Sequence, residues 1–519
     1  MLVKCILLIL FFAVMIGVGF YCRRTASDVQ GFVLGGRNVG SWLTAFAFGT
    51  SYFSAVIFVG YAGQFGWKYG LAATWIGIGN ALIGSLLAWR ILGRRTRLMT
   101  QHLQSATMPD FFGKRFFSNA LKVAASVIVF IFLIPYTASL YNGLSRLFSM
   151  AFNVDYVWCV LGMAILTGIY VLVWGYMATA VNDFIQGLIM LVGICAVVAS
   201  VLSGNGGFSA AVESLSHIPS ETAPGLSGAF VSFLGPQPIY LLCVVLLTSL
   251  GTWGLPQMVG KFYAIKNEDS IKKGTMISTF FAIIVAGGCY FLGGFGRLYP
   301  VDVAKDGFDA VVPQMLSTLS PVLIGVVIVL VLSASMSTLS SLVLTSSSTL
   351  TLDFLAPLGK KEMDEKKKMR IMRIFIVVFV VISALIAIKQ YKSKSFFIAQ
   401  MMGVSWGALA GAFLAPFLYG LYYKKTTKAA VVVSFVFGVG MELVQLCISL
   451  GWLDLSGSSL LSFVFKNSLY SGVFAMVGGL ILVPLVSLCT QKTKPKDVDA
   501  MFECYNATKT VEITDSLGE

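Results

Sequence analysis

Charged residues are scarce in this chain, and histidine is almost absent. Asp, Glu, Lys and Arg make up 12% of the 519 residues, whereas soluble domains carry about 25%. There are 2 histidines and 9 cysteines, and no CxxC pair, so neither a zinc site nor a disulfide framework is indicated. The HExxH motif is also missing. These absences exclude a soluble enzyme, a disordered chain and a secreted disulfide scaffold, and they indicate that the chain is not an enzyme.

Apolar residues dominate instead, at 57% with a mean hydropathy of +0.85. A helix that spans a bilayer needs about 20 apolar residues. On that criterion we predict an all-α membrane protein with about 13 transmembrane helices. The predicted spans are 3–21, 42–64, 71–92, 120–150, 155–175, 182–204, 230–256, 274–296, 318–350, 371–388, 396–421, 428–450 and 468–489.

The net charge of +14 is distributed unevenly between the loops. Lysine and arginine concentrate in alternate loops, above all at Arg90–Arg97 and Lys360–Arg373, and such loops face the cytoplasm. This pattern predicts a multi-pass protein of the plasma (inner) membrane, with its N-terminus outside and its C-terminus in the cytoplasm. The positive charge therefore marks cytoplasmic loops, and we expect no nucleic-acid partner.

Two predicted spans contain residues that interrupt a helix. Gly49 is followed by a run of hydroxyl residues in 41–60, and Gly251, Gly254 and Pro256 crowd together in 246–264. Glycine loosens a helix and proline removes one of its hydrogen bonds. Ordinary glycine packing and a proline kink would explain either segment alone. The pairing of the two, five spans apart, favours broken helices, which mark the binding site in many transporters.

A third stretch, 333–353, is unusually rich in hydroxyl groups. Ala334, Ser337, Thr338 and Ser341 share one helix face. Sodium is a hard cation that prefers oxygen ligands, so hydroxyls and unwound backbone carbonyls suit it. Two alternatives remain, because small residues also mediate close helix packing and hydroxyls also bond back to their own helix.

Asp183 is an ionisable residue near the start of a predicted span. No lysine or arginine lies within five positions of it, and an unpaired buried carboxylate is costly. A bound sodium ion would supply the missing charge. Alternatively, Asp183 caps the beginning of a helix together with Asn182.

Several segments resemble the sodium/solute symporter family, and locally its pantothenate/monocarboxylate and proline branches. The most specific are LGGR (34–37) and MSTLS (336–340), and NDFIQGLIM (182–190) and GLPQMVGKFYA (254–264) also match. The resemblance implies a sodium-driven, alternating-access transporter with sodium as the coupling ion and no other cofactor. It also implies a five-plus-five inverted-repeat core in which the first helix of each repeat is broken.

This organisation divides the chain into six parts. They are an N-terminal span and loop (1–41), the first repeat (42–204), an extracellular loop (205–229), the second repeat (230–421), two C-terminal spans (422–490) and a cytoplasmic tail (491–519).

The resemblance also assigns ion sites. The family's common sodium site matches the backbone carbonyls of Thr50, Phe53 and Ala334, and the hydroxyls of Ser337 and Thr338. A second sodium site, present in some members, matches Asp183, Ser337, Ser340 and Ser341.

The resemblance does not identify a single solute. Sodium/proline members have an aspartate where Tyr52 stands and aromatic residues where Thr248 and Thr252 stand, and only Tyr136 agrees. These departures favour the pantothenate and monocarboxylate branch, with a neutral polar solute or an amino acid as alternatives. We expect the pocket to be lined by Tyr52, Ser54, Tyr136, Thr252 and Trp253, with Trp75 further out.

The predicted function is sodium-coupled symport of a small organic solute by a monomer in the lipid bilayer. Its partners are the solute, sodium and lipid. The alternative is a sodium-independent or proton-coupled uniporter or channel of the same fold.

Overall fold

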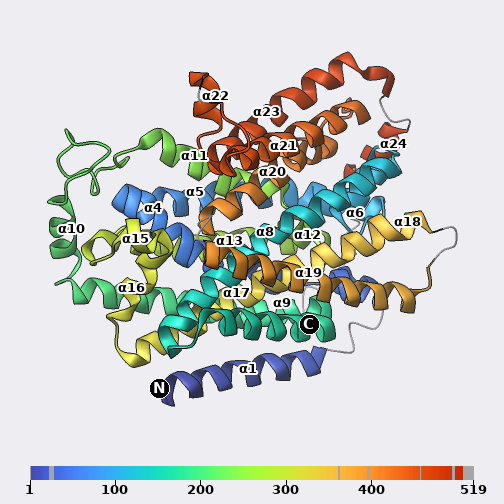
Figure 1. Ribbon diagram of the computed structural model, residues 1–519. Helices are drawn as coiled ribbons and strands as arrows, with labels where there is room; N and C mark the ends of the chain where they lie inside the picture. Colours follow the sequence, from blue (N-terminus) through green and yellow to red (C-terminus); the bar gives the residue numbers. More distant parts are fainter. Residues whose placement is uncertain are drawn as a thin grey trace, which may run out of the picture.

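The computed structural model describes residues 2–22, 29–359, 363–393, 398–455, 457–493 and 497–506. Within these ranges the chain is helical, and strand-like pairing is confined to one bridge between Val39 and Ile265. The long helices lie side by side and run in similar directions (Figure 1). The predicted all-α class is therefore confirmed.

The helices of the first part of the chain are α1 (Leu2–Cys22), α2 (Val29–Leu34), α3 (Ser41–Tyr52), α4 (Ala62–Tyr69), α5 (Thr74–Gly79), α6 (Arg94–His102), α7 (Met108–Arg115), α8 (Asn119–Phe152), α9 (Tyr156–Gly204) and α10 (Phe208–Ser216). Those that follow are α11 (Pro238–Ser249), α12 (Pro256–Tyr263), α13 (Glu268–Ala282), α14 (Gly288–Gly293), α15 (Val303–Asp306), α16 (Val311–Ser317), α17 (Pro321–Thr349), α18 (Ala356–Leu358), α19 (Glu365–Ser393), α20 (Ile398–Tyr422), α21 (Lys428–Ser449), α22 (Ser459–Val464), α23 (Ser468–Cys489) and α24 (Val498–Phe502). Tighter or wider helical turns connect several of them, including η3 (Val56–Tyr61), η5 (Asn80–Leu87) and η7 (Leu250–Gly254).

Local chemistry explains where these helices begin and bend. The side chains of Ser118 and Ser320 accept hydrogen bonds from the first-turn amides of α8 and α17, which are otherwise unpaired. Gly70 ends α4 with φ +62°, and Gly175 bends α9 with φ +63°. Only glycine adopts this backbone region without strain. The bend at Gly175 separates the predicted spans 155–175 and 182–204.

Ten helices in the described part are long and apolar enough to cross a membrane, and up to eleven if the bent pair Pro238–Gly254 and Pro256–Tyr263 forms one span. The difference from the predicted number has two causes. The run Val56–His102 counts once, although it contains the end of the predicted span 42–64 and all of 71–92, and Tyr156–Leu172 is shorter than the required length. The number of spans and the inverted repeat remain predictions.

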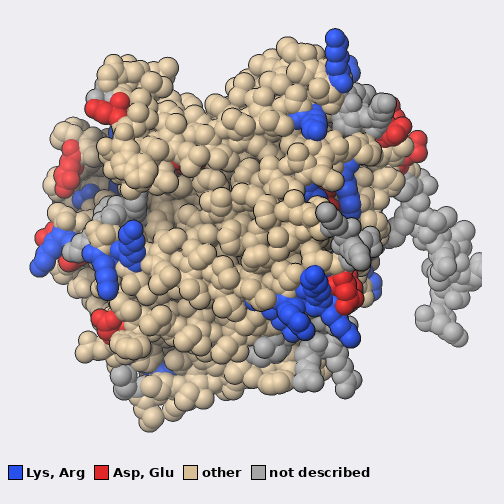
Figure 2. All heavy atoms as spheres, turned by 45° about the vertical axis from the view of Figure 1, so that its right-hand side comes forward, with Lys and Arg blue, Asp and Glu red and all other residues tan. Residues whose placement is uncertain are grey.

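The outer surface fits a protein embedded in lipid. Large apolar side chains are exposed on α1, α9, α19 and α21. Figure 2 shows charged side chains gathered towards two opposite sides of the molecule, with an uncharged band between them. We call these sides the α6 end, which also carries α18 and α24, and the α10 end, which also carries α15 and α16 (Figure 1).

The interior is formed by α17 and α20, which are buried almost throughout. Helix α17 packs against α3, α8 and α9, while α21 and α23 pack against α20. Part of the hydrophilic tail packs against the rest of the protein. Val498, Met501 and Phe502 of α24 are buried, and Tyr505 stacks on Arg95 of α6. The rest of the predicted cytoplasmic tail, at 494–496 and 507–519, lies outside the described residues.

Candidate functional site

The helix that begins at Ser41 breaks near its middle. Helix α3 ends at Tyr52, Phe53 is extended with φ −96° and ψ 132°, and helical structure resumes in η3. A break of this kind leaves carbonyl oxygens without their usual partner four residues later. All the residues of the break are buried, so these carbonyls need partners from elsewhere in the protein.

The partners come from α17. The Thr338 hydroxyl lies 3.3 Å from the Thr50 carbonyl oxygen, 3.2 Å from that of Phe53 and 3.1 Å from that of Ala334. The Ser337 hydroxyl donates to the Thr50 hydroxyl at 2.8 Å. One Thr338 proton cannot satisfy three carbonyl oxygens at once. The result is a buried cluster with more oxygen acceptors than donors, which is the chemistry that a hard cation requires. The structure brings together all five residues assigned to the common sodium site.

The second broken helix is formed by α11, η7 and α12. Helix α11 continues through η7 to Gly254, Leu255 is extended, and α12 begins at Pro256 after a bend of 47°. Proline at the first helical position needs no amide partner, which suits it to restarting a helix. Both predicted breaks are therefore present. The Tyr52 hydroxyl of the first donates to the Thr248 carbonyl just before the second.

Arg37 of the LGGR segment fastens the end of α12 in place. Its guanidinium donates to the carbonyls of Tyr263 at 3.3 Å and Ser105 at 2.6 Å. Next to it, the Val39 amide donates to the Ala264 carbonyl at 3.1 Å. The start of the first broken helix and the end of the second are thus held together at the α6 end.

Asp183 lies deep in α9 and faces a lysine from another helix. Its Oδ2 is 3.8 Å from Nζ of Lys261 on α12, and that Nζ donates to the Ser341 hydroxyl at 3.0 Å. Ser340 was expected to bind a second sodium ion together with Asp183. Its hydroxyl instead donates to the carbonyls of Met336 and Ser337 on its own helix. Sequence proximity could not show Lys261, because it is brought to Asp183 only by the packing of α12.

The residues expected to line the solute pocket fall into two groups. Tyr52 and Tyr136 both contact the ring of Trp406 on α20, with centroid distances of 6.2 Å and 5.9 Å. The Ser54 hydroxyl, the Tyr136 hydroxyl and the Trp406 Nε1–H are buried, and none has a hydrogen-bond partner among the described residues. We call Tyr52, Ser54, Tyr136 and Trp406 the central cluster. It holds three unused hydrogen-bond donors.

The other three predicted residues lie outside this cluster. Trp75 donates to the Phe233 carbonyl at 2.8 Å and packs against the exposed ring of that residue. Trp253 donates to the Ile83 carbonyl at 3.0 Å, and the Thr252 hydroxyl bonds to the Ser249 carbonyl of its own helix. Trp406 was missed because its own helix is mostly apolar and contains no polar run that would single it out.

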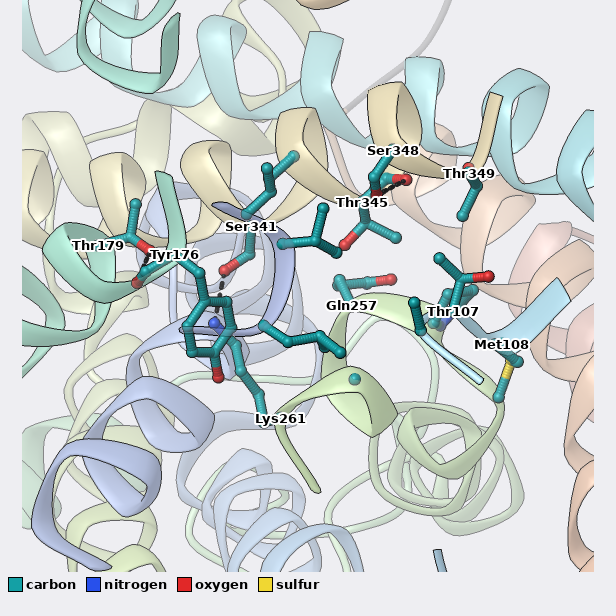
Figure 3. A pocket seen from close by; sticks show the side chains of 16 residues that line it. Thr107, Met108, Tyr176, Thr179, Gln257, Lys261, Ser341, Thr345, Ser348 and Thr349 are labelled. Atoms are coloured by element: carbon teal, nitrogen blue, oxygen red, sulfur yellow. Dashed lines mark hydrogen bonds between the residues drawn. The ribbon is translucent and has the colours of Figure 1, made fainter. Parts of the chain in front are cut away.

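A small cavity of about 50 Å³ lies between the second break and the α6 end. Figure 3 shows Lys261, Tyr176 and Ser341 on one side of it, with Gln257 and Thr107 further along. The walls come from α2, α9, α12 and α17 and from the connection between α6 and α7.

Two broken helices that face a hydroxyl-rich helix define a class of protein. Secondary transporters bind their solute and coupling ion at discontinuous helices, where free backbone groups are available in the membrane interior. The chain belongs to the sodium:solute symporter family, whose sequence model matches residues 32–438. It is a multi-pass membrane transporter and not an enzyme, and sodium is its coupling ion.

Curated relatives match along most of their length. The chain is 25% identical over 508 residues to the osmoregulated proline transporter OpuE of Bacillus subtilis, covering 96% of each protein. It is 27% identical over 478 residues to the sodium/proline symporter of Salmonella typhimurium, covering 89% of this chain and 91% of the relative.

Solved structures share the fold at low sequence identity. A Na⁺-coupled sialic acid symporter in a substrate-bound, outward-open state matches with a TM-score of 0.73 at 16% identity, over 94% of this chain and 98% of that one. The nucleobase-cation-symport-1 family transporter Mhp1 in a closed conformation matches with a TM-score of 0.51 at 12% identity, over 91% of this chain and 98% of that one.

Proposed function

We propose that the protein couples inward sodium movement to the uptake of a small amino acid, and that proline is the first solute to test. The observation that carries the sodium part is the convergence of the Thr50, Phe53 and Ala334 carbonyls on the Thr338 hydroxyl. We assign the coupling sodium to this oxygen cluster, together with Ser337. Because the cluster joins α3 to α17, a bound ion links two elements of the transporter and can favour one of its conformations.

The central cluster supports an amino acid as the solute. A carboxylate only accepts hydrogen bonds, and the unused groups of Ser54, Tyr136 and Trp406 can donate. The faces of Tyr52, Tyr136 and Trp406 offer an aromatic surface that attracts an ammonium group and packs against apolar carbons. A small zwitterion with an apolar ring satisfies both features.

The local sequence segments and the full-length relatives indicate different solutes. The local resemblance to pantothenate and monocarboxylate symporters favoured an organic acid, whereas the two curated relatives above are proline transporters. Tyr52, Thr248 and Thr252 remain departures from the proline pattern, and Tyr52 is the one at the first break. In this structure its hydroxyl is bonded to the Thr248 carbonyl, so it closes the space between the two breaks.

The decisive measurement is uptake by purified protein in proteoliposomes. We expect proline uptake that needs an inward sodium gradient and stops when sodium is replaced by choline. Pantothenate, a short monocarboxylate, a second neutral amino acid and the amide of proline complete the panel. Because the carboxylate engages the central cluster, the amide should be a poor solute. Uptake that ignores sodium and follows a proton gradient would contradict the proposal.

One observation favours an organic anion as a second candidate. A cavity of about 220 Å³ at the α10 end is lined by Lys68 and Lys466, and both ammonium groups lie over the ring of Tyr240, at 5.7 Å and 5.5 Å from its centroid. Neither lysine forms a salt bridge with a described carboxylate. Two cations without a carboxylate partner raise the local concentration of anions at the α10 end.

The anion candidate makes a separate prediction. Changing both Lys68 and Lys466 to Gln should lower uptake of an anionic solute at least about tenfold at low concentration and low salt, because the attraction is electrostatic. Uptake of a zwitterion should change far less. Lys305→Gln, an exposed lysine at the same end, is the matched control. Initial rates measured at several ionic strengths decide between the two solute classes.

A further inference from the structure

Lys261 is a buried cation held by three kinds of group. Its Nζ lies 3.8 Å from the Asp183 carboxylate and 3.0 Å from the Ser341 hydroxyl, and 5.1 Å from the centroid of the Tyr176 ring. The lysine side chain is 4% exposed and that of Asp183 is 0% exposed. Figure 3 shows the amino group directed at Ser341, with Tyr176 beside it. A carboxylate, a hydroxyl and an aromatic face together form a binding site for a cation.

This arrangement does not fit a second sodium ion. The residues expected to hold that ion are Asp183, Ser337, Ser340 and Ser341. In the structure Ser341 accepts from Lys261, and Ser340 bonds to its own helix. A sodium ion placed on Asp183 would face the ammonium group at close range in a poorly screened interior, where two like charges repel strongly.

We propose that the ammonium group of Lys261 takes the place of a second sodium ion, so that the protein binds a single sodium ion in each transport cycle. Lys261 neutralises Asp183, which would otherwise be an unpaired buried charge. The inference rests on the proposed sodium site at the break of α3, and it assigns Asp183 to the protein's own lysine rather than to the coupling ion.

Binding of radioactive sodium to purified protein tests the number of ions directly, without relying on the identity of the solute. We expect about one sodium ion per wild-type protein at saturation. Thr338→Ala should lose most of this binding, because it removes a ligand of the proposed site. Lys272→Met removes an exposed lysine on α13, and its sodium binding should equal that of the wild type.

Variants of Lys261 test whether its ammonium group replaces a second sodium ion. Lys261→Met leaves Asp183 without a cation, so it should bind about two sodium ions, with the Hill coefficient for sodium rising above one. The double variant Asp183→Asn/Lys261→Met removes both charges and should again bind about one ion. It also serves if the single variant fails to fold, because it leaves no unpaired buried charge.

Three results would overturn the inference. The first is a wild-type protein that binds two sodium ions; this result would refute the single-ion inference but not the proposed sodium-coupled transport. The second is a folded Lys261→Met protein whose sodium binding equals that of the wild type. The third is a folded double variant that binds no sodium, which would place Asp183 within the single site. A wild-type protein that binds no sodium would instead refute the proposed sodium site, and the inference with it.

Discussion

Thr338→Ala is expected to lower the apparent sodium affinity about 10- to 100-fold, because a hydrogen-bonding or ligand group on a charged partner contributes about 1.5–3 kcal/mol. The Thr338 hydroxyl is the point where the Thr50, Phe53 and Ala334 carbonyls converge. The affinity for solute should fall as well, since the coupling between two ligands is reciprocal. Sodium titrations of binding and of solute uptake measure both effects.

Two matched variants on α17 separate ligand loss from general damage. Thr338→Ser keeps the hydroxyl and should retain most of the sodium affinity. Ser347→Ala removes a hydroxyl that bonds only to the Val343 and Leu344 carbonyls of its own helix, and its sodium titration should match that of the wild type. If Thr338→Ala titrates like Ser347→Ala, the cluster does not bind the coupling ion.

The second large effect concerns folding. Gly66→Ala is expected to abolish most of the folded protein, because α4 and α14 touch through their backbones at this point. A Cβ on Gly66 would lie 2.0 Å from the Gly293 carbonyl oxygen, and a Cβ on Gly293 would lie 2.2 Å from that of Ala62. The helices would have to separate, and overpacking of this severity costs about 3 kcal/mol or more. Yield and elution of a fluorescent fusion in size-exclusion chromatography measure the loss.

Gly162→Ala provides the comparison for this prediction. Gly162 also lies in an apolar helix, but a Cβ there would meet nothing within 4 Å. The same chemical change should therefore leave the elution profile and the melting temperature unchanged. A Gly66→Ala protein that elutes and melts like Gly162→Ala would show that α4 and α14 do not pack in this way.

The parts of the site that could be predicted from sequence are those with a local signal. Gly251, Gly254 and Pro256 disrupt a helix wherever they occur together, so the second break was visible in the sequence. The hydroxyl face around Ser337 and Thr338 was visible for the same reason, because residues three and four apart share a side of a helix. The hydroxyl face and the carbonyls of the first break meet as expected.

What could not be predicted depends on contacts between distant helices. Lys261 reaches Asp183 only after α12 packs against α17, and nothing within five positions of Asp183 indicates a cation. Trp406 enters the central cluster from a mostly apolar helix, in which the single hydroxyl of Ser405 beside it forms no polar run. Trp75, which was predicted to lie further out, donates to the Phe233 carbonyl and does not join the central cluster.

The fixed ammonium group of Lys261 limits how far the transporter can concentrate its solute. A lysine tethered to the protein returns with it in every cycle, so neither the sodium gradient nor the membrane potential does net work on its charge. For a solute without net charge, one sodium ion moving down a tenfold gradient contributes about 1.4 kcal/mol. A potential of 100 mV adds about 2.3 kcal/mol. Together they sustain a solute ratio of about 500-fold. A second sodium ion would square that ratio, at the expense of drawing twice the sodium current for each solute molecule.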